Sequence, residues 1–163
     1  MPKWVERAKK VSQRSQQNLA AASLQEVVDE ARSVANDIQF IIESSGQGVV
    51  QSIGYDNESI EAVEKFYRLA AKQPSSIPFG IEDFERLLSL YLGQVLVERA
   101  LGEWTTYQGK YHVYFPIVIR LSDGNHVDVF LFCQGLYRKQ VRGSLDGRAL
   151  IKFLEAPGKL ATP

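Results

Sequence analysis

Apolar residues recur at helical spacing through the first two thirds of this chain and at strand spacing near its end. The clearest helical patterns occupy residues 24–44 and 81–101, and a third follows Asp56. Spacings of three and four residues place these apolar side chains on one face of an α-helix. The pattern therefore predicts that helices form most of the first hundred residues.

Several single residues refine the predicted helices. Asp56 or Asn57 can cap the third helix by accepting hydrogen bonds from amides of its first turn. Gly102 suits the left-handed position just beyond the helix predicted over residues 81–101. Gly93 lies inside that helix, where glycine lowers helix stability by about 1 kcal/mol relative to alanine. We therefore expect another backbone or a large ring to approach closely at Gly93.

The pattern changes near residue 103 to the alternation that is typical of β-strands. Residues 104–107, 111–121 and 126–133 are rich in β-branched and aromatic side chains, which favour strands. Asp123 and Gly124 separate the last two segments and accept the positive φ of a tight turn. The sequence therefore predicts a β-hairpin in the last third of the chain.

Together these elements predict an α+β fold in a single domain that spans residues 1–163. A hairpin with apolar residues on both faces cannot bury both faces alone, so the N-terminal helices should pack on this small antiparallel sheet. Residues 144–154 predict a short C-terminal helix. We expect residues 1–22 to form a peripheral or partner-docking helix and residues 156–163 to be a loose tail.

Composition places the chain among globular proteins of a reducing compartment. Apolar residues make up 45% and charged residues 23%, and the formal net charge is zero. A neutral chain has no overall attraction to nucleic acid or to an anionic membrane. The single cysteine, Cys133, excludes an intrachain disulfide, and neither a signal peptide nor a membrane-spanning stretch is recognisable. We expect a cytoplasmic protein without a membrane partner.

Charge is distributed unevenly along the chain. Residues 1–20 carry five bases against one acid, residues 21–103 carry 14 acids against six bases, and residues 134–163 carry six bases against two acids. Such segments can pack against each other in a solvated monomer or meet a partner. A basic patch near Tyr137 makes a nucleic-acid-binding protein an alternative interpretation. Its members are Arg138, Lys139, Arg142 and Arg148.

Cysteine chemistry is a second alternative. A catalytic thiolate needs a base within hydrogen-bond reach and a third group that orients the base. If residues 126–133 form one strand, Cys133 points away from His126 and Asp128, and only His112 remains as a base. These residues lack the ligand spacing of a zinc site, and no glycine-rich phosphate loop is present. We therefore expect no metal and no cofactor.

The densest aromatic group is a candidate protein-binding surface, although core packing would explain some of its members. Tyrosine and tryptophan dominate binding hot spots because they bury a large area and keep a polar group. The candidates are Trp104, Tyr107, Tyr111 and Tyr114. The weak apolar stripe of the first predicted helix, with Trp4 and Val5, also allows pairing in a homodimer.

A series of motifs follows in order between residues 81 and 155. They are Leu90-Tyr91-Leu92-Gly93-Gln94-Val95, Gly102-Glu103-Trp104, Phe115-Pro116-Ile117-Val118, Asp123-Gly124 and Val127-Asp128-Val129-Phe130. This order of helix, Gly-x-Trp and hairpin resembles uncharacterised bacterial domains of unknown function. Such domains are similar to some proteins that protect bacteria from their own interbacterial toxins. The resemblance implies a protein-binding role without catalytic residues. The leading hypothesis is therefore a non-enzymatic protein-interaction module, and one such module is an immunity protein that binds and neutralises a toxin.

Overall fold

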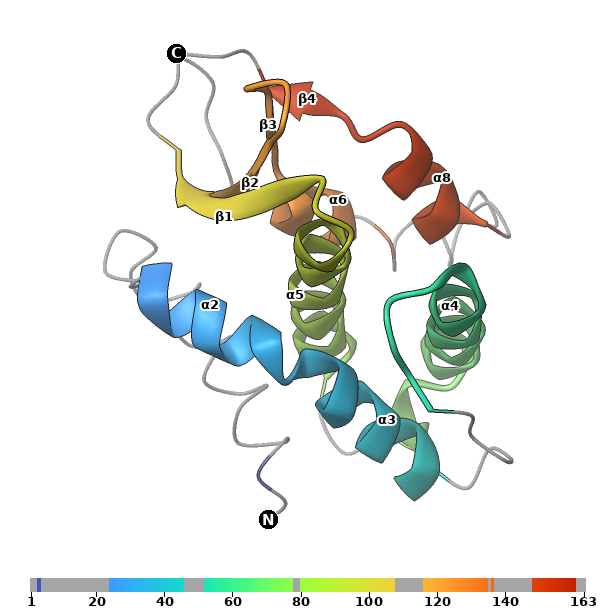
Figure 1. Ribbon diagram of the computed structural model, residues 1–163. Helices are drawn as coiled ribbons and strands as arrows, with labels where there is room; N and C mark the ends of the chain where they lie inside the picture. Colours follow the sequence, from blue (N-terminus) through green and yellow to red (C-terminus); the bar gives the residue numbers. More distant parts are fainter. Residues whose placement is uncertain are drawn as a thin grey trace.

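The computed structural model describes residue 3 and residues 24–45, 52–77, 80–107, 116–134, 136 and 148–160. Its elements are α2 (Leu24–Arg32), α3 (Val34–Ser44), α4 (Asn57–Lys72), the 3-10 helix η2 (Pro74–Ser76), α5 (Ile81–Glu98), β1 (Gly102–Thr106), β2 (Ile117–Leu121), β3 (His126–Val127), α6 (Val129–Gln134), α8 (Ala149–Glu155) and β4 (Lys159–Leu160). Helices α2 to α5 precede a small antiparallel sheet, and the short helices α6 and α8 come between its strands β3 and β4 (Figure 1), so the predicted α+β fold is confirmed.

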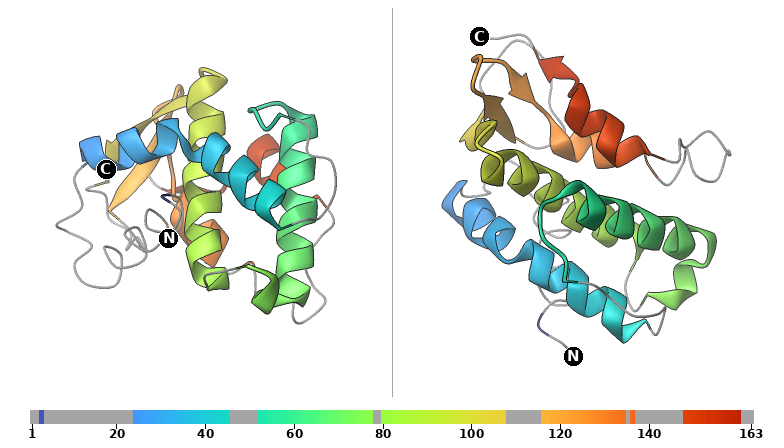
Figure 2. Two further views of the ribbon diagram at one scale, coloured as in Figure 1. Left: turned by 90° about the horizontal axis from the view of Figure 1, so that it is seen from below. Right: turned by 45° about the vertical axis from the view of Figure 1, so that its right-hand side comes forward.

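Helix α5 is the centre of the fold. It packs against α2, α3, α4, α6, α8 and the first two strands. Figure 2 shows α2 and α3 crossing α5 on one side and α4 lying beside it. Every residue from 84 to 96 is buried, including the polar ones. A helix that is enclosed on all sides belongs to a protein core, and this environment explains the wide apolar stripe in the sequence.

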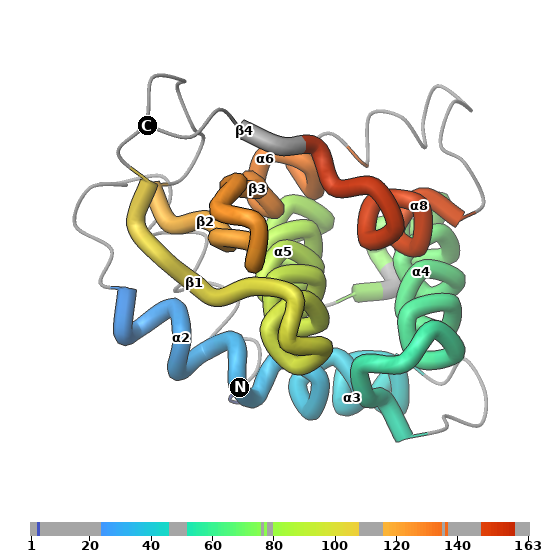
Figure 3. The backbone as a smooth tube through the Cα atoms, turned by 45° about the horizontal axis from the view of Figure 1, so that its top comes forward, coloured from blue at the N-terminus to red at the C-terminus, as the bar shows by residue number. Residues whose placement is uncertain are grey.

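The predicted helix over residues 24–44 is interrupted once. Ser33 separates α2 from α3 with φ −108° and ψ 5°, and its Oγ donates to the carbonyl oxygen of Glu30 at 3.4 Å. Serine side chains compete in this way with the helical hydrogen-bond ladder. Helix α3 nevertheless continues roughly in the direction of α2 (Figure 3). The apolar face of both helices is buried through Val27, Ala31, Val34, Ile38 and Ile41.

Helix α4 begins where the sequence predicts. The Asp56 carboxylate accepts a hydrogen bond from the Ser59 amide at 2.8 Å, as an N-cap residue does. Hydrogen bonds with Ser59 hold the pKa of Asp56 below its ordinary value. The predicted apolar residues are all buried, namely Ile60, Val63, Phe66, Tyr67 and Ala70.

Among the described residues, the sheet contains four antiparallel strands in the order β1-β2-β3-β4. Ile119 pairs with Trp104 on one side and with Val127 on the other, so these buried side chains share the face that meets α5. The predicted turn between β2 and β3 is confirmed. Gly124 has φ +88°, and its amide donates to the carbonyl of Leu121 at 2.9 Å.

The strand predicted over residues 126–133 is wrong for most of its length. Only His126–Val127 pairs in the sheet, and Val129–Gln134 forms helix α6. Asp128 Oδ1 accepts a hydrogen bond from the Leu131 amide at 3.0 Å, which satisfies an amide of the first helical turn. In a short apolar run, the spacing of residues does not distinguish a strand from a buried helix. The Asp128 cap therefore favours the helix here.

The chain ends also differ from the prediction. The sequence predicts a loose tail over residues 156–163, but Lys159 and Leu160 pair with Val127 and His126 as strand β4. The C-terminal helix is confirmed as Ala149–Glu155, while the earlier part of its predicted range lies outside the described residues. Apart from residue 3, the predicted helix over residues 1–22 also lies outside them.

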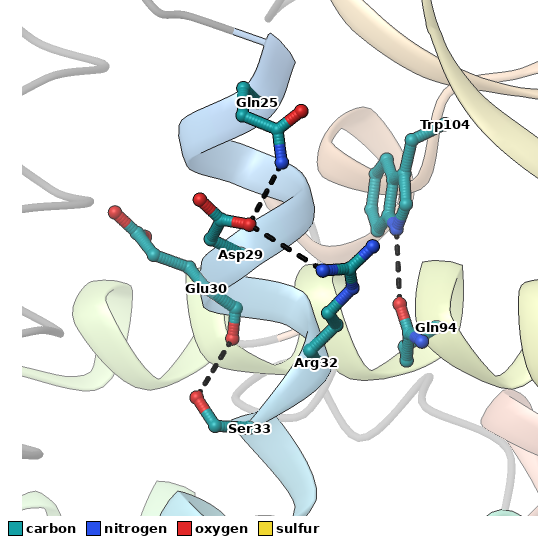
Figure 4. A network of polar contacts seen from close by, with 7 residues as sticks. All are labelled: Gln25, Asp29, Glu30, Arg32, Ser33, Gln94 and Trp104. Atoms are coloured by element: carbon teal, nitrogen blue, oxygen red, sulfur yellow. Dashed lines mark hydrogen bonds and ion pairs between the residues drawn. The ribbon is translucent and has the colours of Figure 1, made fainter.

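Gly93 gives the sheet room to lie directly against α5. A Cβ atom at this position would be 2.2 Å from Cη2 of Trp104. The indole Nε1 donates to Oε1 of Gln94 at 3.2 Å (Figure 4), and the Trp104 side chain is buried. The expectation that a large ring approaches Gly93 is therefore confirmed.

The substitution Gly93→Ala should lower the free energy of unfolding by about 1–2 kcal/mol. The methyl group would displace the rigid indole, and this overpacking outweighs the gain in helix propensity. Chemical denaturation followed by circular dichroism measures the change. Gly158→Ala is the control, because a Cβ atom there meets nothing within 4 Å. Equal stability of the two variants would contradict the close contact.

Candidate functional site

The aromatic candidates from the sequence do not form an open surface. Trp104 and Tyr107 are 8% and 6% exposed. Trp104 fills the space beside Gly93, and the Tyr107 ring packs against the His126 ring with centroids 5.5 Å apart. Tyr111 and Tyr114 lie outside the described residues. The two described aromatic residues therefore stabilise the fold and are not available to a partner.

One member of the predicted basic patch is described. Arg148 is exposed, and its guanidinium lies 3.9 Å from a carboxylate oxygen of Glu61. An exposed ion pair of this kind contributes little to stability. Arg138, Lys139 and Arg142 lie outside the described residues. The nucleic-acid interpretation thus stays a prediction from the sequence.

The environment of Cys133 does not suit a nucleophile. Its side chain is 0% exposed. It lies in α6, which packs on α5. Burial raises the pKa of the Cys133 thiol, while hydrogen bonding with Ser89 acts in the opposite direction. His126 is on the sheet against Tyr107, and His112 lies outside the described residues. Catalytic thiols need the thiolate form and access to substrate.

The thiol of Cys133 should be unreactive toward a disulfide reagent in the folded protein at pH 8. Reaction then requires opening of the core, so its rate should rise with denaturant in parallel with unfolding. The chain has one cysteine, so release of the chromophore reports on this site alone. The denatured protein is the control for full reactivity. Rapid reaction of the native protein would contradict the buried assignment.

The described residues contain neither a recognisable metal site nor a helix that could span a membrane. No group of three or more histidine, cysteine, aspartate or glutamate side chains there has the arrangement of a metal site. Within the same part of the chain, no helix combines the length and the apolar character needed to cross a bilayer.

An open groove lies where the end of α5, the β2–β3 turn and the end of α8 meet. Its volume is about 510 Å³. Most of the lining is apolar and comes from Leu96, Leu101, Leu121, Leu154, Ala156 and Pro157. Ser122, Asp123 and Glu155 complete it, and all three are exposed. We call this feature the α5-end groove, and it is the candidate functional site.

The end of α5 brings a large apolar side chain to this groove. Ala100 has φ 57°, its amide donates to the carbonyl of Val97 at 3.0 Å, and the Leu101 amide donates to that of Leu96 at 2.9 Å. This pair of hydrogen bonds defines the Schellman motif, which is often accompanied by an apolar contact between its C″ and C3 residues. In this chain these two residues are Leu101 and Leu96. Leu101 stays 46% exposed.

The left-handed residue is Ala100 and not the predicted Gly102, which begins β1. A Cβ atom at Gly102 would be 2.6 Å from Cγ2 of Ile119 and 2.8 Å from the carbonyl oxygen of Arg120. The close approach of β2 therefore requires glycine at position 102. The positive φ falls on an alanine, for which this conformation costs about 1–2 kcal/mol.

Hydrogen bonds hold the β2–β3 turn in place beside α5. The amide and hydroxyl of Ser122 donate to the carbonyl of Leu101 at 3.0 and 3.2 Å. Within the turn, the Asn125 amide donates to the Asp123 carboxylate at 2.9 Å. The Leu121 amide donates to the Asn125 carbonyl at 2.7 Å. Two walls of the groove are thus formed and joined before any partner binds.

A second hollow of about 500 Å³ adjoins the first across Leu121 and Ser122. The ion pair between Arg120 and Glu103 lies on this side of the turn. Because the two charges neutralise each other at the surface, this hollow offers no net charge to a ligand from that pair. The lining of the α5-end groove is more apolar than the lining of this second hollow, so the groove is the better candidate for a binding site.

A scan against protein-family models and searches of curated proteins and of solved structures find no match. The resemblance to toxin-immunity proteins therefore stays a prediction from residues 81–155. Sequence reasoning also missed the α5-end groove, because Leu101 continues the apolar series of α5 and was assigned to the helix. The one available signal was the turn at residues 123–124, which marks where the hairpin meets solvent.

Replacing Ala100 by glycine should raise the free energy of unfolding by about 0.5–1 kcal/mol. Glycine adopts the left-handed conformation without strain, and this gain exceeds its larger entropy loss on folding. Ala62→Gly inside α4 is the matched control and should lower stability by about 1 kcal/mol. Urea denaturation measures both changes. A destabilised Ala100→Gly variant would be inconsistent with a strained helix end.

Proposed function

We propose that this chain is a non-enzymatic protein-interaction module that acts as an immunity-type protein and neutralises a toxin by binding it. The observation that carries the binding part is the α5-end groove, where the half-exposed Leu101 lies among other apolar side chains. Scattered exposed leucines are common, whereas a contiguous apolar hollow favours contact with another molecule. At protein interfaces, pockets of this kind are filled by anchor side chains of the partner.

The rigidity of the groove also supports a binding role. The helix end and the turn are joined through the Leu101 carbonyl, and α5 itself is enclosed by the core. Association is opposed by the entropy lost when loops and side chains become ordered. A surface that is already ordered loses less entropy on binding, so a larger part of the contact energy appears as affinity.

The immunity part of the proposal rests on the resemblance of residues 81–155. That segment contains every residue that lines the groove apart from Ala156 and Pro157, which directly follow it. A cysteine-dependent enzyme is less well supported, because Cys133 is buried and its thiol pKa is raised by burial. The interaction module is the function that fits the described residues best.

Affinity isolation of the tagged full-length chain from its native source should recover one partner protein in near-equal amount. The same tag on an unrelated protein is the control for background. The partner, expressed alone in a bacterial host, should slow growth, and co-expression of this chain should restore it. Repeated isolation of the chain alone would contradict the interaction module. A partner that is harmless to the host would remove the immunity role only.

A further inference from the structure

The α5-end groove carries negative charge from two different elements. Asp123 belongs to the β2–β3 turn, and Glu155 is the last residue of α8. Both side chains are exposed. Arginine and lysine are absent from the residues of the described chain that line this groove. Its apolar surface is therefore accompanied by carboxylates on two sides.

Local stability does not account for the position of Glu155. The C-terminal end of a helix carries partial negative charge, so a carboxylate is disfavoured there and a base is preferred. Ala100 on the neighbouring element is also unfavourable, because it adopts φ 57° without being glycine. Glu155 thus lines the groove although it opposes local stability, and the strained Ala100 directly precedes Leu101, which also lines it. Locally unfavourable residues of this kind are common at functional sites.

We infer that the α5-end groove binds an apolar side chain of the partner protein that has a lysine or arginine next to it. This inference rests on the proposed function. The apolar side chain contacts Leu101, Leu121 and Pro157, while the neighbouring cation is attracted by Asp123 and Glu155. Complementary charge selects the partner and speeds its association, and burial of the apolar side chain supplies most of the affinity.

A second copy of this chain is the competing occupant. Its residues 1–14 contain five bases together with Trp4 and Val5, so the same chemistry is present within the sequence. The inference assigns the groove to a different protein, and the full-length chain should then be monomeric in light scattering. A concentration-dependent dimer that Leu101→Asp abolishes would assign the groove to a second copy and overturn the inference.

Peptides selected from a random phage-displayed library against the full-length chain test the inference directly. The selected peptides should share an aromatic or aliphatic residue within two positions of a lysine or arginine. In fluorescence anisotropy, Leu101→Asp should weaken their binding at least about tenfold, which corresponds to loss of one buried apolar anchor. Glu155→Lys should weaken binding about threefold to tenfold and reduce its dependence on salt.

Leu131→Asp is the matched control, because Leu131 is 51% exposed on α6 and does not line the groove. Its peptide affinity should stay within about twofold of the parent chain, since surface changes away from the site have small effects. Circular dichroism verifies that Leu101→Asp is folded. Glu155→Lys gives an independent test, because a base at that helix end favours the fold.

Acidic selected peptides, or unchanged binding in Leu101→Asp and Glu155→Lys, would overturn the inference. The native partner separates this failure from failure of the proposed function. If Leu101→Asp recovers that partner at the parental yield, the groove is not the binding site but the interaction module stands. If the parent chain recovers no partner, the proposed function itself fails.

Discussion

The contact between the Trp104 ring and Gly93 joins the sheet to the central helix α5, on which the other long helices also pack. A Cβ atom added at position 93 would lie only 2.2 Å from Cη2 of the Trp104 indole. This approach closes α5 from the side of β1, so residues 84–96 are buried all round. Burial of that much apolar surface is the dominant favourable term in folding. Only three residues, 99–101, separate α5 from β1, so the same contact fixes the helix end that borders the groove.

Much of the helical part follows from the sequence, because its signals are local. The spacing in α4 and α5 and the Asp56 cap predict both helices. The signals are weaker where two local preferences compete. Ser33 breaks a helix that the apolar spacing alone would continue, and the Asp128 cap turns a strand-like run into α6. Strand β4 was missed because its pairing with β3 is a long-range contact with no local signal.

The candidate site could not be predicted from the amino-acid sequence because it depends on several tertiary contacts, each between segments far apart in the chain. Gly102 is required by the approach of β2, and the left-handed conformation falls on Ala100, where α5 ends two residues earlier. That conformation directs Leu101 to the surface rather than along the apolar stripe of α5. The turn of β2–β3 and the end of α8 then complete the groove. No single residue in this series carries a motif, and the two described residues of the favoured aromatic group, Trp104 and Tyr107, are buried.

The packing of α5 should hold the groove in place before a partner binds. Amide hydrogen exchange of the free full-length chain tests it most directly. The Leu101 amide donates to the Leu96 carbonyl, and the Ser122 amide donates to the Leu101 carbonyl. The hydrogens of both amides should therefore exchange only through the cooperative opening that also exposes the Leu92 amide of α5. Exchange of these two amides at the rate of an unstructured peptide, while Leu92 stays protected, would contradict a preformed groove.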